Sequence, residues 1–89
     1  MPETQVLTLT RAGDRLALLR LAGAVRAAYD RSAMIYTDTD LAGWIDRWMT
    51  AHGHHVAIDV LPEGGLRFSD GDAGAWAAIR RATTEARFA

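Results

Sequence analysis

The second half of the chain contains a repeated alternation of apolar and polar residues, interrupted by turn-forming chemistry. Residues 54–61 place Val, Ile and Val at every second position, which is the period of a β-strand. Residues 62–65, Pro-Glu-Gly-Gly, are typical of a turn. The alternation then resumes over residues 66–69, with Leu66 and Phe68 on one face. The segment predicts a β-hairpin, so the fold must contain a sheet.

The other predicted elements follow from the same analysis of periodicity. Residues 6–10 alternate as a strand does, and residues 14–29 repeat their apolar positions at helical spacing. Residues 33–37 form a short apolar run that is typical of a buried strand. Residues 40–52 and 73–88 again have helical spacing, and each follows aspartates that suit a helix N-cap.

The resulting element order is β-α-β-α-β-β-α. It predicts an α/β (α+β) two-layer sandwich with a four-stranded mixed sheet, helices on one face and an extra C-terminal helix. The first two strands would run parallel through a right-handed crossover. A chain of 89 residues has room for one core. We therefore expect a single domain over residues 4–88, with a C-terminal helical extension from about residue 72.

The face of this sheet that the first two helices leave open would carry apolar side chains, among them Val6, Ala57 and Leu61. Such a face is too apolar to be left in water. It would be covered either by the last helix or by a second copy of the chain.

The composition excludes several classes of function. Without cysteine the chain has no disulfide, thiolate metal site or cysteine nucleophile. Ten basic and eleven acidic residues give a net charge of −1, which provides no general attraction to nucleic acid or anionic lipid. No apolar run reaches the roughly 18–20 residues of a membrane span, and the N-terminus lacks the regions of a signal peptide. We expect a cytoplasmic protein without a cofactor, a membrane contact or a nucleic-acid partner.

Residues 34–69 contain a series of motifs in a characteristic order: the strand Met34-Ile35-Tyr36, an acidic turn with Asp38 and Asp40, a helix bearing Trp48, the pair Gly53-His54, and the hairpin. In this order the segment resembles the second half of the TusA/SirA-like sulfur-carrier family. The resemblance implies that family's β-α-β-α-β-β sandwich.

The family's chemistry depends on a Cys-Pro-x-Pro motif at the start of the first helix, where a thiolate carries a persulfide. Residues 11–15, Arg-Ala-Gly-Asp-Arg, stand at that place and contain neither cysteine nor proline. Asp14 there suits a helix N-cap but would repel an anionic substrate. The resemblance thus implies a carrier-like scaffold without the atom that carries sulfur.

Tryptophan and arginine point to a protein interface. Trp44 lies one helical turn before Trp48, and Trp76 is near the start of the last predicted helix. Exposed tryptophans and arginines are typical anchors of interfaces. We predict a non-enzymatic binding or regulatory module that contacts a protein partner or itself, with Trp44 and Trp76 as anchors and Arg80 and Arg81 at the rim. The alternative that the tryptophans are simply core residues remains open.

A second hypothesis is a small-ligand or metal site near His52 and His54, with a catalytic role left open. Imidazole is a common metal ligand. His54 and His55 are adjacent on a predicted strand and would face opposite sides, so only His52 and His54 could converge. This uneven spacing favours a simpler interpretation, in which His52 complements the negative end of a helix dipole.

Asp38 and Asp40 are the remaining candidates for a ligand-binding or acid-base role. Close carboxylates can split their pKa values and act as a pair. Their place at the start of a helix favours capping instead. The sequence contains no recognisable catalytic motif, so we assign no catalytic residue and no metal ligand.

Overall fold

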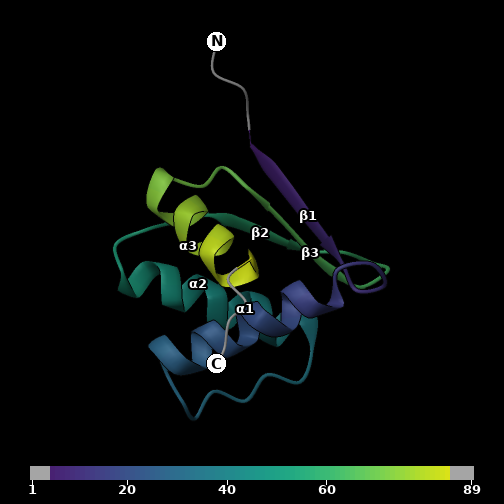
Figure 1. Ribbon diagram of the computed structural model, residues 1–89, viewed down its shortest axis with the longest axis horizontal. Coiled ribbons are helices and arrows are strands. Elements are labelled where there is room, and N and C mark those ends of the chain that lie inside the picture. The colour runs from purple at the N-terminus through teal and green to yellow at the C-terminus, as the bar shows by residue number, and fades with distance from the viewer. Residues whose placement is uncertain (1–4, 85–89) are drawn as a thin grey trace.

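The computed structural model describes residues 5–84, which form three helices and one sheet (Figure 1). The elements follow one another in the order β1 (Val6–Thr10), α1 (Arg15–Ala28), α2 (Asp38–Ala51), β2 (Ala57–Val60), β3 (Gly65–Ser69) and α3 (Ala73–Thr84). The α+β class and the predicted hairpin are therefore confirmed. The predicted helical residues beyond 84 and the domain's first residue, 4, lie outside the described residues.

The predicted four-stranded mixed sheet is wrong. Within residues 5–84 the sheet has three strands in the order β1-β3-β2, and both pairings are antiparallel. Residues 33–37 form no strand, so α1 leads through an irregular connection directly into α2, and the expected parallel crossover is absent from the described residues.

The local contacts explain why residues 33–37 do not extend as a strand. Ala33 is buried, but Met34 and Tyr36 are 60% and 77% exposed. The backbone N–H of Tyr36 donates to the Asp40 carboxylate at 3.0 Å, and that of Thr37 does so at 3.2 Å. The run is thereby tied to the start of α2 rather than to a neighbouring strand.

The two faces of the sheet differ in the way that the alternation predicts. On β3, the central strand, Phe68 pairs with Leu7 of β1 and Ile58 of β2. Leu66, two residues before Phe68 on the same face of β3, pairs with Leu9 and Val60. Phe68 and Leu66 are fully buried, whereas the intervening Arg67 is exposed. Because paired residues lie on the same face, this face forms the floor of the core.

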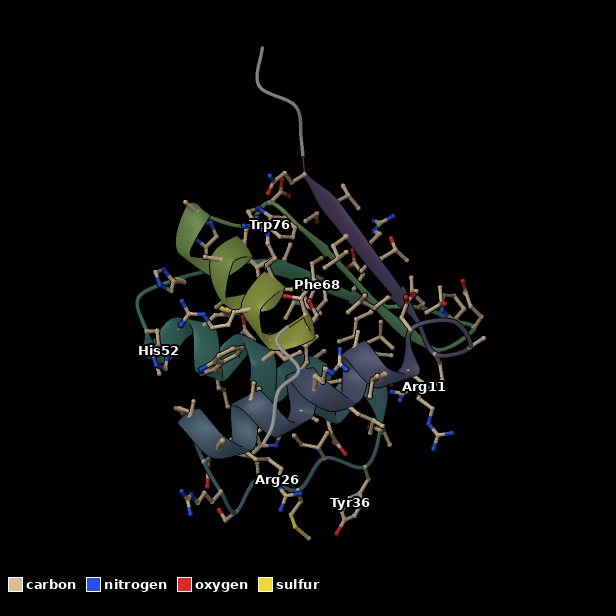
Figure 2. All side chains as sticks on the ribbon, viewed as in Figure 1. Arg11, Arg26, Tyr36, His52, Phe68 and Trp76 are labelled. Carbon is tan, nitrogen blue, oxygen red and sulfur yellow. The ribbon has the colours of Figure 1, made fainter. Side chains whose placement is uncertain are left out.

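All three helices contribute to one core with that face. Leu21 of α1, Ile45 of α2 and Ile79 of α3 are fully buried in the same cluster as Phe68. Figure 2 shows Phe68 near the centre of the molecule. The opposite face of the sheet exposes Val6 and Ala57. The described part of the last helix therefore packs with the other two helices (Figure 1). The expectation that this helix covers the open face is wrong, and the alternative, a second copy of the chain, stays a prediction.

The helix termini refine the predictions. Thr37 is the N-cap of α2, and its hydroxyl accepts the backbone N–H of Asp40 at 3.1 Å. Asp14 occupies the N-cap position of α1, but its carboxylate accepts the backbone N–H of Thr10 at 2.9 Å and makes no capping bond.

Leu61, expected on the open face, is half-buried in the β2–β3 turn, where its N–H donates to the Gly65 carbonyl.

Candidate functional site

A groove of about 800 Å³ lies between α1, the C-terminal end of α2 and α3. Its wall on α1 consists of Leu19, Arg20, Gly23, Ala24, Ala27 and Ala28. The rest of its described lining consists of Trp48, Met49, His52, His54, Ala78, Arg81 and Ala82. The groove therefore brings together His52 and His54, predicted as ligand residues, with Arg81, predicted as an interface residue.

The groove is hollow because its walls carry small side chains. Gly23 and Ala27 are one helical turn apart on α1, and Ala78 and Ala82 are one turn apart on α3. A Cβ atom placed on Gly23 would have no neighbour within 4 Å. Larger residues at these positions would fill the space between the two helices, so the hollow is a direct result of the sequence.

His52 is held at one end of the groove by its own helix. Its Nδ1 lies 2.9 Å from the backbone carbonyl of Trp48, and because a carbonyl can only accept, this nitrogen donates. The imidazole also lies edge-on to the Trp48 indole, with 6.2 Å between the ring centroids. Figure 2 shows His52 at the C-terminal end of α2. Nε2 is the ring nitrogen left to meet a ligand.

His54 is fixed by the loop before α3. Its Nδ1 is 3.4 Å from one carboxylate oxygen of Asp72, and its ring lies where a side chain at Gly74 would otherwise be. His55 Nδ1 is 3.3 Å from the other carboxylate oxygen of Asp72. The prediction that His54 and His55 face opposite sides of a strand is wrong, because β2 begins at Ala57 and both imidazoles lie against the same carboxylate.

Asp72 serves as the N-cap of α3. Its carboxylate accepts the backbone N–H of Ala75 at 2.7 Å and that of His55 at 3.0 Å. These bonds, the Ala75 bond first, lower the pKa of Asp72 from its ordinary value, and the two histidines act in the same direction. The carboxylate beside His54 thus already has partners in the fold, and it lies outside the groove lining.

The described residues do not assemble a metal site around these histidines. Nowhere between residues 5 and 84 do three or more His, Cys, Asp or Glu side chains converge in a way that could hold a metal ion. The groove itself contributes two imidazoles from this set, His52 and His54.

The two arginines predicted for an interface rim separate in the structure. Both are exposed, but Arg81 lines the groove, whereas the adjacent Arg80 lies outside the groove lining. A further cation, Arg20, comes from α1, and its guanidinium donates to the Thr83 carbonyl at 3.0 Å. Arg20 was not predicted, because its proximity to α3 depends on how the two helices pack.

Trp44 and Trp76, the predicted anchors, are both half-buried and do not form one patch. Trp44 packs against Tyr29, with 6.0 Å between ring centroids, and the Arg47 guanidinium lies 4.8 Å from the Trp44 ring centroid. Trp76 packs against Gly71, where a Cβ atom would come within 3.0 Å of the indole. Neither lines the groove, and their role in a protein contact stays a prediction.

Asp38 and Asp40 have structural partners rather than a shared site. The Asp38 carboxylate pairs with the Arg11 guanidinium and accepts the Gly65 backbone N–H at 2.9 Å. Asp40 accepts the backbone N–H groups of Tyr36 and Thr37, and the Tyr36 bond is the main cause of its lowered pKa. Both aspartates are thus engaged by the fold, and a role for them in ligand binding stays a prediction.

Replacing Asp38 with alanine is expected to lower the free energy of unfolding by about 2 kcal/mol, because a charged acceptor shared by two partners is lost. Urea denaturation measures this change. Asp46→Ala, at an exposed position on the same helix, is the control and should cost less than about 0.5 kcal/mol. Equal effects of the two substitutions would contradict the structural role of Asp38 as a shared partner of Arg11 and Gly65.

The small residues of the groove wall were missed by the sequence analysis, although a signal for them was present. Gly23 and Ala27 in α1, and Ala78 and Ala82 in α3, repeat at helical spacing. Such rows indicate close approach or open space between helices, and only the packing decides which. Trp48 was noted as an aromatic position of its helix, but its place in the groove lining could not be assigned from periodicity.

Comparison with known proteins gives no family for this chain: no family model, no curated protein and no solved structure matches it. The resemblance to sulfur carriers therefore stays a prediction, and the strand at residues 34–36 on which it partly depended is not formed. Among the helices described, none has the length and apolar character to cross a membrane.

Proposed function

We propose that this chain is a small binding protein that takes an apolar organic ligand into the groove between α1, α2 and α3. The observation that carries the proposal is the groove itself. Its volume of about 800 Å³ lies within the roughly 300–1,000 Å³ of small-molecule sites, and its lining combines apolar walls with a few polar groups. The position agrees with the second hypothesis from the sequence, a ligand site near His52 and His54.

Part of the groove lining is held in place by the packed core, which supports binding. Trp48 and Met49 in the lining are themselves buried members of the core. On α3, Ile79 follows the groove-lining Ala78 in sequence and is fully buried. Side chains held by a packed core lose little further freedom when a ligand arrives. This part of the lining is accordingly ready to accept a ligand without reorganising the fold.

The chemistry of the described lining favours binding over catalysis. It contains no Ser, Thr, Cys, Asp or Glu side chain that could act as a nucleophile or a carboxylate base. Each histidine has its Nδ1 turned to a partner of the fold, Trp48 for His52 and Asp72 for His54. No nucleophile–base pair is present in this part of the chain.

The test fills the groove without disturbing the core. In Gly23→Phe the new side chain enters open space, because a Cβ on Gly23 meets no atom within 4 Å. Gly43→Phe is the matched control, since Gly43 is also exposed and helical, has no neighbour within 4 Å of a Cβ, and lies outside the groove lining. The probe is N-phenyl-1-naphthylamine, a neutral apolar dye that becomes fluorescent in apolar sites.

The wild-type protein is expected to bind the dye saturably, and Gly23→Phe is expected to weaken binding at least tenfold, while Gly43→Phe leaves it unchanged. Circular dichroism and thermal unfolding verify that both variants remain folded. The proposal is overturned if folded wild-type protein shows no saturable binding. It is also overturned if folded Gly23→Phe binds the dye as well as Gly43→Phe does.

A further inference from the structure

We infer that the groove is built for an amphiphile with one anionic group, of the carboxylate class, whose charge is held by Arg81; this inference rests on the proposed function. Every ionisable side chain in the described lining is a nitrogen base: Arg20, His52, His54 and Arg81. The whole chain has a net charge of −1, so the basic character of the groove is local and does not follow from the composition.

The four bases are not equally available to a ligand. Arg20 donates to the Thr83 carbonyl, and His52 and His54 each have Nδ1 turned to a protein oxygen. Arg81, by contrast, has no carboxylate within ion-pair distance among residues 5–84. Its planar guanidinium offers parallel N–H donors that match the two oxygens of a carboxylate.

The apolar part of the ligand has a matching place. Along α3, Arg81 lies between the groove-lining Ala78 and Ala82, opposite the small residues of α1 that include Gly23. An alkyl or aromatic body can lie along this stripe while its charged end remains at the solvent-exposed guanidinium. Because the apolar groove has a cation at its margin, it should favour an amphiphilic anion over a purely apolar ligand.

Helix dipoles offer a competing explanation for the basic residues. His52 is the C-cap of α2, and Ala27 and Ala28 are the last residues of α1, so both helices direct about half a negative charge toward this region. Arg81 is in the last turn of the described α3, where its positive charge would complement the negative end of that helix's dipole. Arg80, one residue earlier on α3, carries the same charge close to the same helix end but lies outside the groove lining, so the two arginines separate the explanations.

The experiment compares two ligands of equal chain length, octanoate and 1-octanol, by displacement of N-phenyl-1-naphthylamine at low salt. The wild-type protein is expected to prefer octanoate by about tenfold, the effect of one charge-assisted interaction. Arg81→Gln is expected to abolish this preference while keeping affinity for 1-octanol. Arg80→Gln, which removes the same charge from the adjacent position, is expected to retain the preference.

The possible failures are distinct. If the dye binds and Gly23→Phe blocks it, but octanoate and 1-octanol compete equally, the inference about charge is wrong and the proposed function stands. A preference for octanoate that Arg80→Gln and Arg81→Gln reduce equally reflects general surface charge and also overturns the inference. Absence of saturable dye binding to the wild-type protein removes the proposed function, and this inference with it.

Discussion

Gly65→Ala is expected to destabilise the protein by about 3 kcal/mol, by combining the cost of a left-handed backbone with that of overpacking. Gly65 has φ +112°, a conformation that residues with a Cβ rarely adopt. A Cβ there would contact the Leu9 carbonyl oxygen and come within 2.8 Å of Thr10 Cα and 2.9 Å of Arg11 N. These neighbours are backbone atoms, so they cannot move without disturbing the pairing of β1 with β3.

The same substitution also affects the start of α2. The Gly65 N–H donates to Asp38, and the Asp38 carboxylate pairs in turn with Arg11. A shift of the β2–β3 turn therefore weakens a contact that joins the sheet to a helix. The groove is lined by other residues, so its dye binding should fall only as far as the protein unfolds.

Urea denaturation of Gly65→Ala beside Gly43→Ala provides the measurement. Gly43 is in the interior of α2 with open space around it, so alanine there should raise the free energy of unfolding by about 0.5–1 kcal/mol. The two glycine-to-alanine changes should thus have opposite signs. Similar stability of Gly65→Ala and the wild-type protein would show that the close approach of the two strands is not as described.

The hairpin and the helices could be predicted from the sequence because their signals are local. The alternation over residues 54–61 and the Gly-containing turn identified the hairpin, and the helical spacing after Asp14 identified α1. A short apolar run such as residues 33–37 does not specify its own structure, since it can pair as a strand or lie in a connection with one side chain buried. Whether it forms a strand depends on a hydrogen-bonding partner elsewhere in the chain, which periodicity does not specify.

The candidate site was predicted only where its residues are close in sequence. His52 and His54 come from one segment, and both reach the groove. The opposite wall comes from α1, and its small residues gain a role only when α3 packs beside that helix. Likewise, no local pattern distinguishes Arg81 from Arg80, and the rotation of α3 relative to α1 places one of them at the groove.

Phe68→Ala is expected to lower the free energy of unfolding by about 3–5 kcal/mol, the usual cost of removing a buried phenylalanine ring. Phe68 is fully buried on the central strand, between Leu7 and Ile58 of the two edge strands. Proteins of this length have a total stability of roughly 4–13 kcal/mol, scaled from typical values per residue. The variant should therefore be marginally stable, which urea denaturation and near-ultraviolet circular dichroism can measure.

Val60→Ala is the control for Phe68→Ala, because Val60 belongs to the same sheet face but lies on the edge strand β2 and is 43% exposed. Its loss should cost about 1 kcal/mol or less, since little apolar surface returns to water. A comparable cost for the two substitutions would contradict the central position of Phe68. Dye binding supplies an independent comparison: Phe68→Ala should lose binding in proportion to its unfolded fraction, whereas Gly23→Phe should lose binding while folded. The core and the groove are therefore separable by measurement, although the same three helices form both.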